Sequence, residues 1–507
     1  MSVIRIMGIE TEYGVSSPGH PHANAMLMSS QVVTAYDRAT NTERRRRTRW
    51  DYDVETPLRD ARGFDMSRSE ADSSQLTDDD VGMANVILTN GARLYVDHAH
   101  PEYSSPEVLT PFDATLYDRA GQRIMARAAR LASAEPGAQQ IRLYKNNTDN
   151  KGASYGCHEN YLMPRATPFP SIVETMIPFF VSRQVIAGAG RVGIGQDGKT
   201  SGFQITSRAD FFEVEVGLET TLKRPLINTR DEPHADPQQY RRLHVIIGDA
   251  NLSEYATYLK MGITSLVLSM VEQGWDFTAF ALHRPVRQLH AVSHDPGLTY
   301  EIETADGRRL TAVQLQAEFV EQARKFVDDR YGSDVDAPTA DIVREWETTV
   351  DALRRDPSEL VASLDWIAKM ALLDGYRRRD GLDYGDPRLD LVDLQYSDVD
   401  PDRGLWARLE KHGRLRRLTG DDEEAHAVTS PPEDTRAYFR GECLRRYPKD
   451  VTAASWDSVI FDLPGRSALQ RVPTLDPLRG TKSHVEGLLE TSPSAVDLIS
   501  SLQSMDG

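Results

Sequence analysis

The chain has 507 residues, a formal net charge of −18, 39% hydrophobic and 27% charged residues, a composition typical of an ordinary globular protein with room for two or three average domains. The negative charge argues against a general nucleic-acid binder, because phosphate attraction needs a basic surface. Two distant cysteines, Cys157 and Cys443, give no disulfide framework and predict a reducing, cytoplasmic location. We expect no signal peptide and no membrane association, because no apolar run approaches the roughly 20 residues that span a bilayer.

Helix and strand patterns alternate along most of the chain. Amphipathic or apolar segments with helical spacing predict helices, and short runs rich in β-branched and aromatic residues predict strands. We expect helices at 26–39, 115–134, 171–188 and 253–274, and further helices to about residue 380. We expect strands within 3–15, 86–107, 141–149, 154–163, 201–216 and 241–252, with an Asn90-Gly91 hairpin turn in the second of these.

Two segments break this alternation. Residues 41–80 carry dense charge of both signs and few periodic apolar residues, so we predict a flexible insertion or mobile loop. Residues 418–437 are acidic and contain two prolines, which predicts an exposed linker. Regular patterns return shortly after it. We therefore predict a catalytic domain over 1–430 and a small C-terminal domain over 431–507.

The stretch "GIGQDGKT", residues 193–200, fits the phosphate-binding pattern G-x-x-x-x-G-K-[ST]. That loop needs an apolar strand before its glycines and a helix after the Lys-Thr, so that backbone N–H groups point at phosphate. Here the approach "IAGAGRV" is broken by glycines, and Ile205 and Thr206 favour a strand afterwards. We predict a glycine-rich hairpin, and we expect no nucleotide binding through Lys199.

Four predicted strands carry polar residues on one face. In a strand, residues i, i+2 and i+4 share a face, and the positions between them are apolar, as at Ile9, Leu94 and Val245. The polar sets are Glu10 and Glu12; Arg93, Tyr95 and Asp97; His158 and Asn160; and Arg242 and His244.

One polar face alone is commonly just solvated. Four such faces in one curved sheet would instead form a cradle of carboxylate, imidazole, amide and guanidinium groups. Carboxylates would hold divalent cations, and cations and arginine would bind phosphate, which favours nucleotide chemistry without a P-loop. Histidine is an unusual ligand for Mg²⁺, so His158 and His244 fit magnesium less well.

Five motifs together resemble the Pup ligase/deamidase family over nearly the whole chain: "MGIETEYG", "NGARLYVDHAHPEYSSPE", "SYGCHENYL", "RRLHVIIGDAN" and "AASWDSVIFDL". The resemblance implies an α+β fold, the glutamine-synthetase-like fold of carboxylate-amine ligases: a curved antiparallel sheet cradle backed by helices, plus a small C-terminal domain. One branch of the family ligates the small protein Pup, through its C-terminal Glu, to substrate lysines. The other deamidates the C-terminal Gln of Pup and cleaves the Pup-lysine isopeptide bond.

Two features resemble the deamidase branch. The ligase typically reads Asp-Val-Gly-Ser-His-Pro-Glu after the equivalent strand, whereas residues 97–102 here read "DHAHPE", one residue shorter. The charged stretch 41–80 matches an insertion of the deamidase branch.

The resemblance also implies the site residues. Asp97 matches the catalytic aspartate. The metal positions are Glu10, Tyr95, Glu102, His158 and His244. The nucleotide-binding set is Glu12, which also suits a metal, together with Arg93, Ser105, Asn160, Arg242 and Trp456. The implied cofactors are ATP, or ADP plus phosphate, with Mg²⁺, and the implied partners are Pup and pupylated proteins.

Amide hydrolysis leaves two roles open for Asp97. It either attacks the side-chain carbonyl at the Pup C-terminus, giving an acyl anhydride that water opens, or it activates a water as a base. Because Pup is acidic, we expect a groove lined by Arg or Lys, with Arg208, Arg224 and Arg230 as candidates. The alternatives are the ATP-consuming Pup–protein ligase of the same family, another ligase acting on small molecules, and an inactive Pup-binding adaptor, which the presence of Asp97 disfavours.

Overall fold

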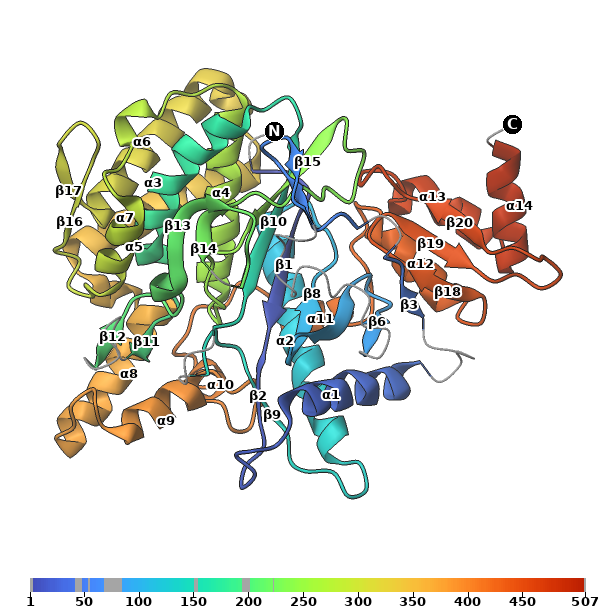
Figure 1. Cartoon of the computed structure of the whole chain (residues 1–507), viewed down its shortest axis with the longest axis horizontal. Helices are drawn as coiled ribbons and strands as arrows, with labels where there is room; N and C mark the ends of the chain where they lie inside the picture. The colour runs from blue at the N-terminus through green and yellow to red at the C-terminus, as the bar shows by residue number, and fades with distance from the viewer. Residues whose placement is uncertain are drawn as a thin grey trace.

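The computed structural model describes residues 3–41, 48–52, 55–67, 84–149, 154–193, 201–221 and 223–505. In these ranges the protein is a mixed α and β structure. A central antiparallel sheet lies between a thick helical layer and a smaller C-terminal unit (Figure 1). No helix in the described ranges is long and apolar enough to cross a membrane.

The central sheet has the strand order β15-β10-β1-β8-β7-β6, and every neighbouring pair is antiparallel. The four predicted polar-faced strands therefore join one sheet, as expected. Their bounds, with those of β6 and β8, are β1 Met7–Glu12, β6 Asn85–Ile87, β7 Arg93–Asp97, β8 His100–Ser104, β10 Cys157–Pro164 and β15 Tyr240–Val245.

Apolar side chains on the other face of this sheet pack against long helices. Met7, Ile9 and Leu243 belong to the main buried core together with residues of these helices. The helices behind the sheet are α2 Pro111–Ser133, α3 Phe169–Ala187 and α4 Glu254–Glu272. Gly121 on α2 permits a close approach to the sheet, because a Cβ there would lie 2.3 Å from the ring of Tyr103 on β8.

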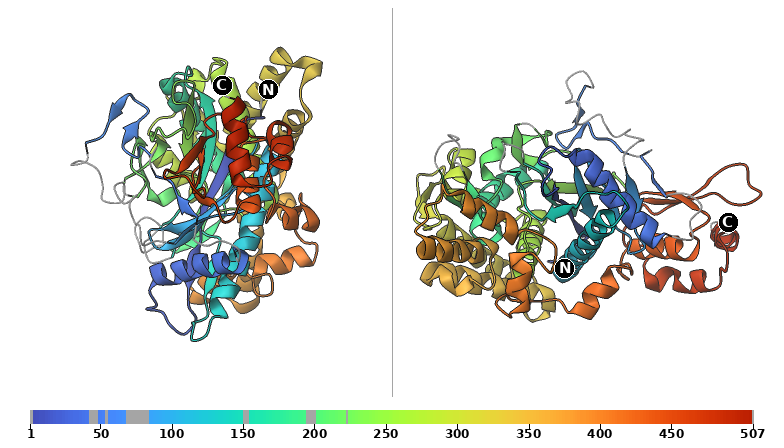
Figure 2. Two further views of the ribbon diagram at one scale, coloured as in Figure 1. Left: turned by 90° about the vertical axis from the view of Figure 1, so that its right-hand side faces the viewer. Right: turned by 90° about the horizontal axis from the view of Figure 1, so that it is seen from below.

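The remaining elements surround this core. Helix α1, Ala25–Thr40, packs on α2, and the two lie between the helical layer and the C-terminal unit when the molecule is seen from below (Figure 2). The outer helices are α5 Pro285–Ser293, α6 Ala312–Arg330, α7 Ala337–Arg355, α8 Asp365–Asp380, α9 Pro387–Tyr396, α10 Leu405–Lys411 and α11 Asp421–Ala427. The short strand pairs are β2 Gly14–Ser16 with β9 Arg142–Tyr144, β4 Arg59–Asp60 with β5 Phe64–Asp65, β11 Arg191–Gly193 with β12 Gly202–Gln204, β13 Phe212–Gly217 with β14 Arg224–Asn228, and β16 Glu301–Glu303 with β17 Arg309–Thr311.

The C-terminal unit has its own sheet and its own apolar core. Its strand order is β20-β19-β18-β3, and the last of these, β3 Arg49–Trp50, comes from the segment after α1 and pairs with β18 in parallel. The other elements are α12 Ala437–Arg446, β18 Val451–Ala454, β19 Ser458–Phe461, β20 Gln470–Pro473, α13 Lys482–Glu490 and α14 Ala495–Met505. The domain boundary at residue 430 stays a prediction.

The predicted helices are confirmed, and so is the hairpin at the glycine-rich stretch. Val192 pairs with Phe203 across the antiparallel strands β11 and β12, so a strand follows the motif; residues 194–200 lie outside the described ranges. Of the predicted flexible insertion 41–80, residues 42–47, 53–54 and 68–80 also lie outside them, and its described parts contain β3, β4 and β5.

The predicted linker at 418–437 is wrong in its first half. Residues 421–427 form α11, and Glu424 on it is fully buried. Its carboxylate is paired with Arg119 and Arg123 of α2 and with Arg417. Acidity alone therefore does not mark an exposed loop, because arginines distant in the sequence can neutralise a buried carboxylate.

Candidate active site

One face of the central sheet carries the polar residues that the sequence predicts. The strand register shows that they share this face: Glu10 lies opposite His158 on one side and Ser104 on the other. Tyr95 likewise lies opposite Glu102. The predicted residues on these strands are Glu10, Glu12, Arg93, Tyr95, Asp97, Glu102, His158, Asn160, Arg242 and His244.

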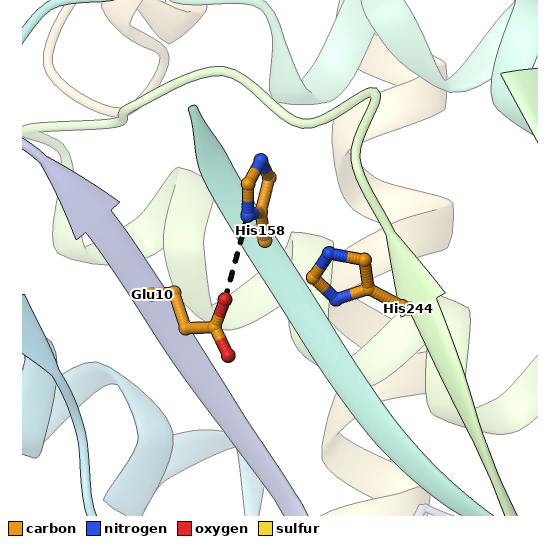
Figure 3. Close-up of side chains that lie close together, drawn as sticks. All are labelled: Glu10, His158 and His244. Atoms are coloured by element: carbon orange, nitrogen blue, oxygen red, sulfur yellow. Dashed lines mark hydrogen bonds and ion pairs between the residues drawn. The ribbon is translucent and has the colours of Figure 1, made fainter. Parts of the chain in front are cut away.

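Glu10, His158 and His244 form a group that we call the histidine cluster. They come from β1, β10 and β15 and point toward one another (Figure 3). One ligand atom of each lies within 4.8 Å of the others, and Glu10 Oε2 is 3.4 Å from His158 Nδ1. Burial would raise the pKa of Glu10, but the hydrogen bond with His158 and the charge of Arg242 lower it far below its ordinary value. The cluster thus offers one carboxylate and two imidazoles to a cation.

Asn160 sets the protonation of the second histidine. Its Oδ1 accepts hydrogen bonds from His244 Nδ1 at 2.9 Å and from Arg242 Nη1 at 3.0 Å. Because an amide oxygen only accepts, Nδ1 of His244 carries the proton and Nε2 keeps its lone pair. Burial and the charges of Arg242 and His158 hold the pKa of His244 well below its ordinary value. His244 is therefore neutral, the form that binds metal ions.

Glu12, Asp97 and Glu102 form the carboxylate cluster. One oxygen of each lies within 4.8 Å of the others. Glu12 is held by His100 Nδ1 at 2.9 Å and by the backbone N–H of Gly156 at 2.6 Å. Burial and the negative charges of Asp97 and Glu12 raise the pKa of Glu102 well above its ordinary value. A cation would remove this repulsion, so the donor set fits a hard divalent ion.

Asp97 lies at the end of β7, at the accessible edge of the carboxylate cluster. Its side chain is 39% exposed, and its Oδ1 is 3.1 Å from His98 Nδ1. Partial burial would raise the pKa of Asp97, but the hydrogen bond and charge of His98 and then the charges of His158 and Arg93 lower it. The carboxylate is ionised and reachable, as a nucleophile or base must be.

Arg93 and Tyr95 form an aromatic-lined wall beside these clusters. The Arg93 guanidinium lies 3.9 Å from the centroid of the Tyr95 ring and 4.1 Å from that of Trp50. Burial and the charge of Glu102 raise the pKa of Tyr95 well above its ordinary value. Tyr95 is therefore a neutral phenol, and its predicted role as a metal ligand stays a prediction.

Two cavities open on the polar face, and Trp456 of the C-terminal unit lines both. The larger holds about 350 Å³ and is lined by Glu10, Arg93, Tyr95, Asp97, Glu102, His158, Arg242, His244 and Trp456 among others. The smaller holds about 80 Å³, and its predicted residues are Glu10, Ser105, Asn160, Arg242 and Trp456.

Two predicted residues, Glu12 and Ser105, are less available to a ligand in these cavities. Glu12 lines neither cavity. Ser105 Oγ accepts from the backbone N–H of Ile9 at 3.0 Å and donates to the carbonyl of Pro106 at 3.1 Å. A groove of about 1140 Å³ between β13 and α5 is larger but contains none of the predicted residues, so chemistry rather than size selects the site.

The structure adds lining residues that the sequence patterns missed. Glu232 and His234 line the larger cavity, and His234 also lines the smaller one together with Arg436. The segment before β15 has no periodic pattern, but its run "NTRDEPHAD" concentrates charge next to a predicted strand. This cluster of charged residues is the sequence feature that could have indicated these lining residues.

Of the three arginines expected at a substrate groove, Arg208 is buried and donates to the carbonyl of Tyr155 at 3.0 Å. Burial and the nearby charge of Arg224 lower the pKa of Arg208 to about 10. Arg208 is therefore not a surface residue, and that expectation was wrong. Arg230 lines the larger cavity.

Comparisons with known proteins place this site in a family. Residues 5–460 match the family described as Pup-ligase protein. A depupylase from Acidothermus cellulolyticus is 63% identical over 98% of this chain and 99% of its own length, and a Pup deamidase/depupylase from Mycolicibacterium smegmatis is 57% identical over the same shares. A Pup–protein ligase from Acidimicrobium ferrooxidans is 40% identical over 80% of this chain and 89% of its own length.

Two solved structures share the fold. The complex of the prokaryotic ubiquitin-like protein Pup with its ligase PafA has a TM-score of 0.79 at 31% identity, over 96% of this chain and 92% of that chain. PafA in complex with ADP has a TM-score of 0.71 at 34% identity, over 80% and 89%. The chain belongs to the Pup-ligase protein family.

Proposed function

We propose that this chain is a Pup deamidase and depupylase. It hydrolyses the side-chain amide at the C-terminus of Pup, converting a terminal Gln to Glu and cleaving the isopeptide bond between Pup and a substrate lysine. The observation that carries the proposal is the ionised, accessible carboxylate of Asp97 beside a buried carboxylate cluster. The relatives at 63% and 57% identity, against 40% for a ligase, support the hydrolase over the ATP-consuming Pup–protein ligase.

The proposed fold is that of glutamine synthetase: a curved antiparallel sheet that forms a cradle, backed by helices, with domains at 1–430 and 431–507. The six-stranded sheet with one polar face and one helix-covered face supports it. The separate apolar core of the C-terminal unit supports the second domain.

The donor atoms fit ATP, or ADP plus phosphate, with Mg²⁺. Glu10, Glu102, His158 and His244, with Tyr95 beside them, would hold cations. The buried Nε of Arg242 has no hydrogen-bond partner in the described part of the chain, as expected of a group that binds phosphate oxygens. When bound, the divalent cations would supply positive charge that stabilises negative charge developing during the reaction. The nucleotide-binding set would be Glu12, Arg93, Ser105, Asn160, Arg242 and Trp456.

In the proposed mechanism, Asp97 is the nucleophile. Its lowered pKa makes it a weak base but keeps it ionised. One carboxylate oxygen adds to the amide carbonyl, and the C–N bond breaks as the nitrogen takes up a proton and leaves as ammonia or as the lysine amine. Water then opens the acyl-aspartate anhydride, which restores the Asp97 carboxylate, frees the Pup glutamate and releases two protons. One replaces the proton that the leaving nitrogen took up, and the other protonates the released amine. The net change is the addition of one water.

The proposed partners are Pup and pupylated proteins. The solved complex of Pup with a relative of the same fold supports this. Of the three candidate groove arginines, Arg230 lines the larger cavity, where it could meet an acidic C-terminus.

The test uses purified protein with Mg²⁺ and ATP, incubated separately with Pup ending in Gln, with a pupylated protein, and with Pup ending in Glu plus free substrate. We expect release of ammonia and of Pup in the first two. Asp97→Asn should reduce both rates by about 10³-fold or more while nucleotide still binds. New conjugates in the third tube without hydrolysis in the others would establish the ligase instead.

A further inference from the structure

The turn that follows the catalytic strand has an unusual residue in an unusual conformation. Asp97 and His100 are directly opposite in the antiparallel pair β7–β8, so only His98 and Ala99 make the turn. His98 has φ of 51°, in the left-handed region that glycine enters freely and that side chains with a Cβ enter at a cost. Glycine is the residue that two-residue turns of this kind favour first.

The imidazole of His98 has a specific contact in this conformation. Its Nδ1 is 3.1 Å from Oδ1 of Asp97, the proposed nucleophile. The side chain of His98 is 48% exposed, and both residues line the larger cavity. Burial of apolar surface therefore does not explain why a bulky ring occupies the turn.

We infer that His98 is a positioning residue for Asp97: its Nδ1 holds one carboxylate oxygen and so directs the other toward the substrate carbonyl. This inference rests on the proposed function. The close contact of Nδ1 with Oδ1 limits rotation of the carboxylate about its Cβ–Cγ bond. A nucleophile held near its attack geometry reacts faster than one that rotates freely.

Two substitutions separate this role from the role of the turn. Glycine at 98 keeps the left-handed conformation and removes the ring. Asparagine also tolerates that conformation, and its Nδ2 lies two bonds beyond Cβ, as Nδ1 of histidine does. His98→Asn therefore keeps the turn and the hydrogen-bond donor, whereas His98→Gly keeps only the turn.

The experiment measures kcat and KM for isopeptide cleavage of a pupylated protein with Mg²⁺-ATP, together with the Tm of each variant. We expect His98→Gly to lower kcat about 10- to 100-fold with KM within about twofold, and to raise Tm by about 1 °C because backbone strain is relieved. His98→Asn should keep at least about a third of kcat. A merely structural residue would not lower activity while raising stability.

Arg284→Gly is the matched control. Arg284 also has a left-handed backbone, with φ of 48°, but it is exposed at the start of α5 and lines neither cavity of the polar face. Glycine there should raise Tm without changing kcat. Full kcat in His98→Gly, or a His98→Asn variant as slow as His98→Gly, would overturn the inference.

The outcomes also separate this inference from the proposed function. If the wild type ligates instead of hydrolysing, the proposed function fails, and the same variants compared by ligation kcat decide the inference. A wild type inactive in both reactions overturns both.

Discussion

The two clusters on the polar face differ in their balance of charge. In the histidine cluster, Glu10 is surrounded by two imidazoles and by Arg242, and its pKa is lowered. In the carboxylate cluster, Glu102 faces two further carboxylates, and its pKa is raised. Both lie on one sheet face and each groups its ligand atoms within 4.8 Å.

This difference shows that two clusters of similar geometry can differ in their need for a bound cation. The protein itself supplies the counter-charge for Glu10, whereas the carboxylate cluster is left with surplus negative charge that a bound cation would offset. We therefore expect the first cluster to be stable without metal and the second to be stabilised by a bound cation. The predictions below test this contrast, beginning with a carboxylate that is paired completely.

Glu107 is a carboxylate paired with two arginines, and its substitution has the largest expected effect on the free energy of unfolding. It accepts from Arg436 Nε at 2.6 Å and pairs with Arg440. Although burial would raise the pKa of Glu107, the two arginines lower it from 4.5 to about 2. Because the folded-state pKa lies below the unfolded one, its stabilisation is present above about pH 4.5 and is lost as the pH falls toward 2, by about 2 kcal/mol between about pH 6 and about pH 3.

Urea unfolding of the wild type and of Glu107→Gln at these two pH values checks this. The variant should be destabilised by about 3 kcal/mol near neutral pH, and its free energy of unfolding should fall about 2 kcal/mol less on acidification. Equal losses in both proteins would show that Glu107 does not carry this dependence.

The next largest effect is that glutamine substitutions in the two clusters should change the free energy of unfolding in opposite directions. Without metal, Glu10→Gln should lower the free energy of unfolding by about 1–3 kcal/mol, because it removes a charged partner of buried hydrogen bonds. Glu102→Gln should instead raise it by about 1 kcal/mol, because it relieves repulsion. Thermal unfolding in EDTA gives both values.

Repeating the scans with Mg²⁺-ATP should reverse the second sign, since the ligand stabilises the wild type more than Glu102→Gln. Destabilisation by both variants in EDTA would show that the two clusters do not differ in their balance of charge.

The smallest expected effect lies outside both clusters. Lys199→Ala should change the Kd for ATP by less than about twofold, because strands flank the glycine-rich motif and phosphate is expected at the sheet. Isothermal titration with Mg²⁺-ATP measures it, with Arg242→Ala as the comparison that should weaken binding strongly. A large loss of ATP affinity in Lys199→Ala would show that the phosphates bind at the glycine-rich motif and not at the two clusters.

Local patterns explain what was predictable. The period-two alternation around Glu10, Tyr95 and His158 reports the face of each strand, and that face survives whatever the strand order is. The grouping into two clusters depends on register between strands distant in sequence, which no local pattern encodes.

The features that were not predicted depend on an unusual turn residue or on contacts between segments distant in the sequence. The turn at His98 escaped notice because histidine is not a turn residue by preference, and β8 was therefore not separated from β7. Glu424 is buried because Arg119 of α2 and Arg417, in the segment before α11, pair with it. His234 and Arg436 reach the cavities through tertiary packing alone.

The strand contributed by residues 49–50 to the C-terminal sheet has a consequence for synthesis of the chain. Ser458 donates to Asp51 across 407 residues of sequence, and the ring of Trp50 meets that of Trp456 at 5.2 Å. On a ribosome, β1 emerges early, but the wall that Trp456 adds to both cavities emerges after nine-tenths of the protein has been made. The charged face of the sheet therefore lacks this wall until synthesis of the chain is almost complete.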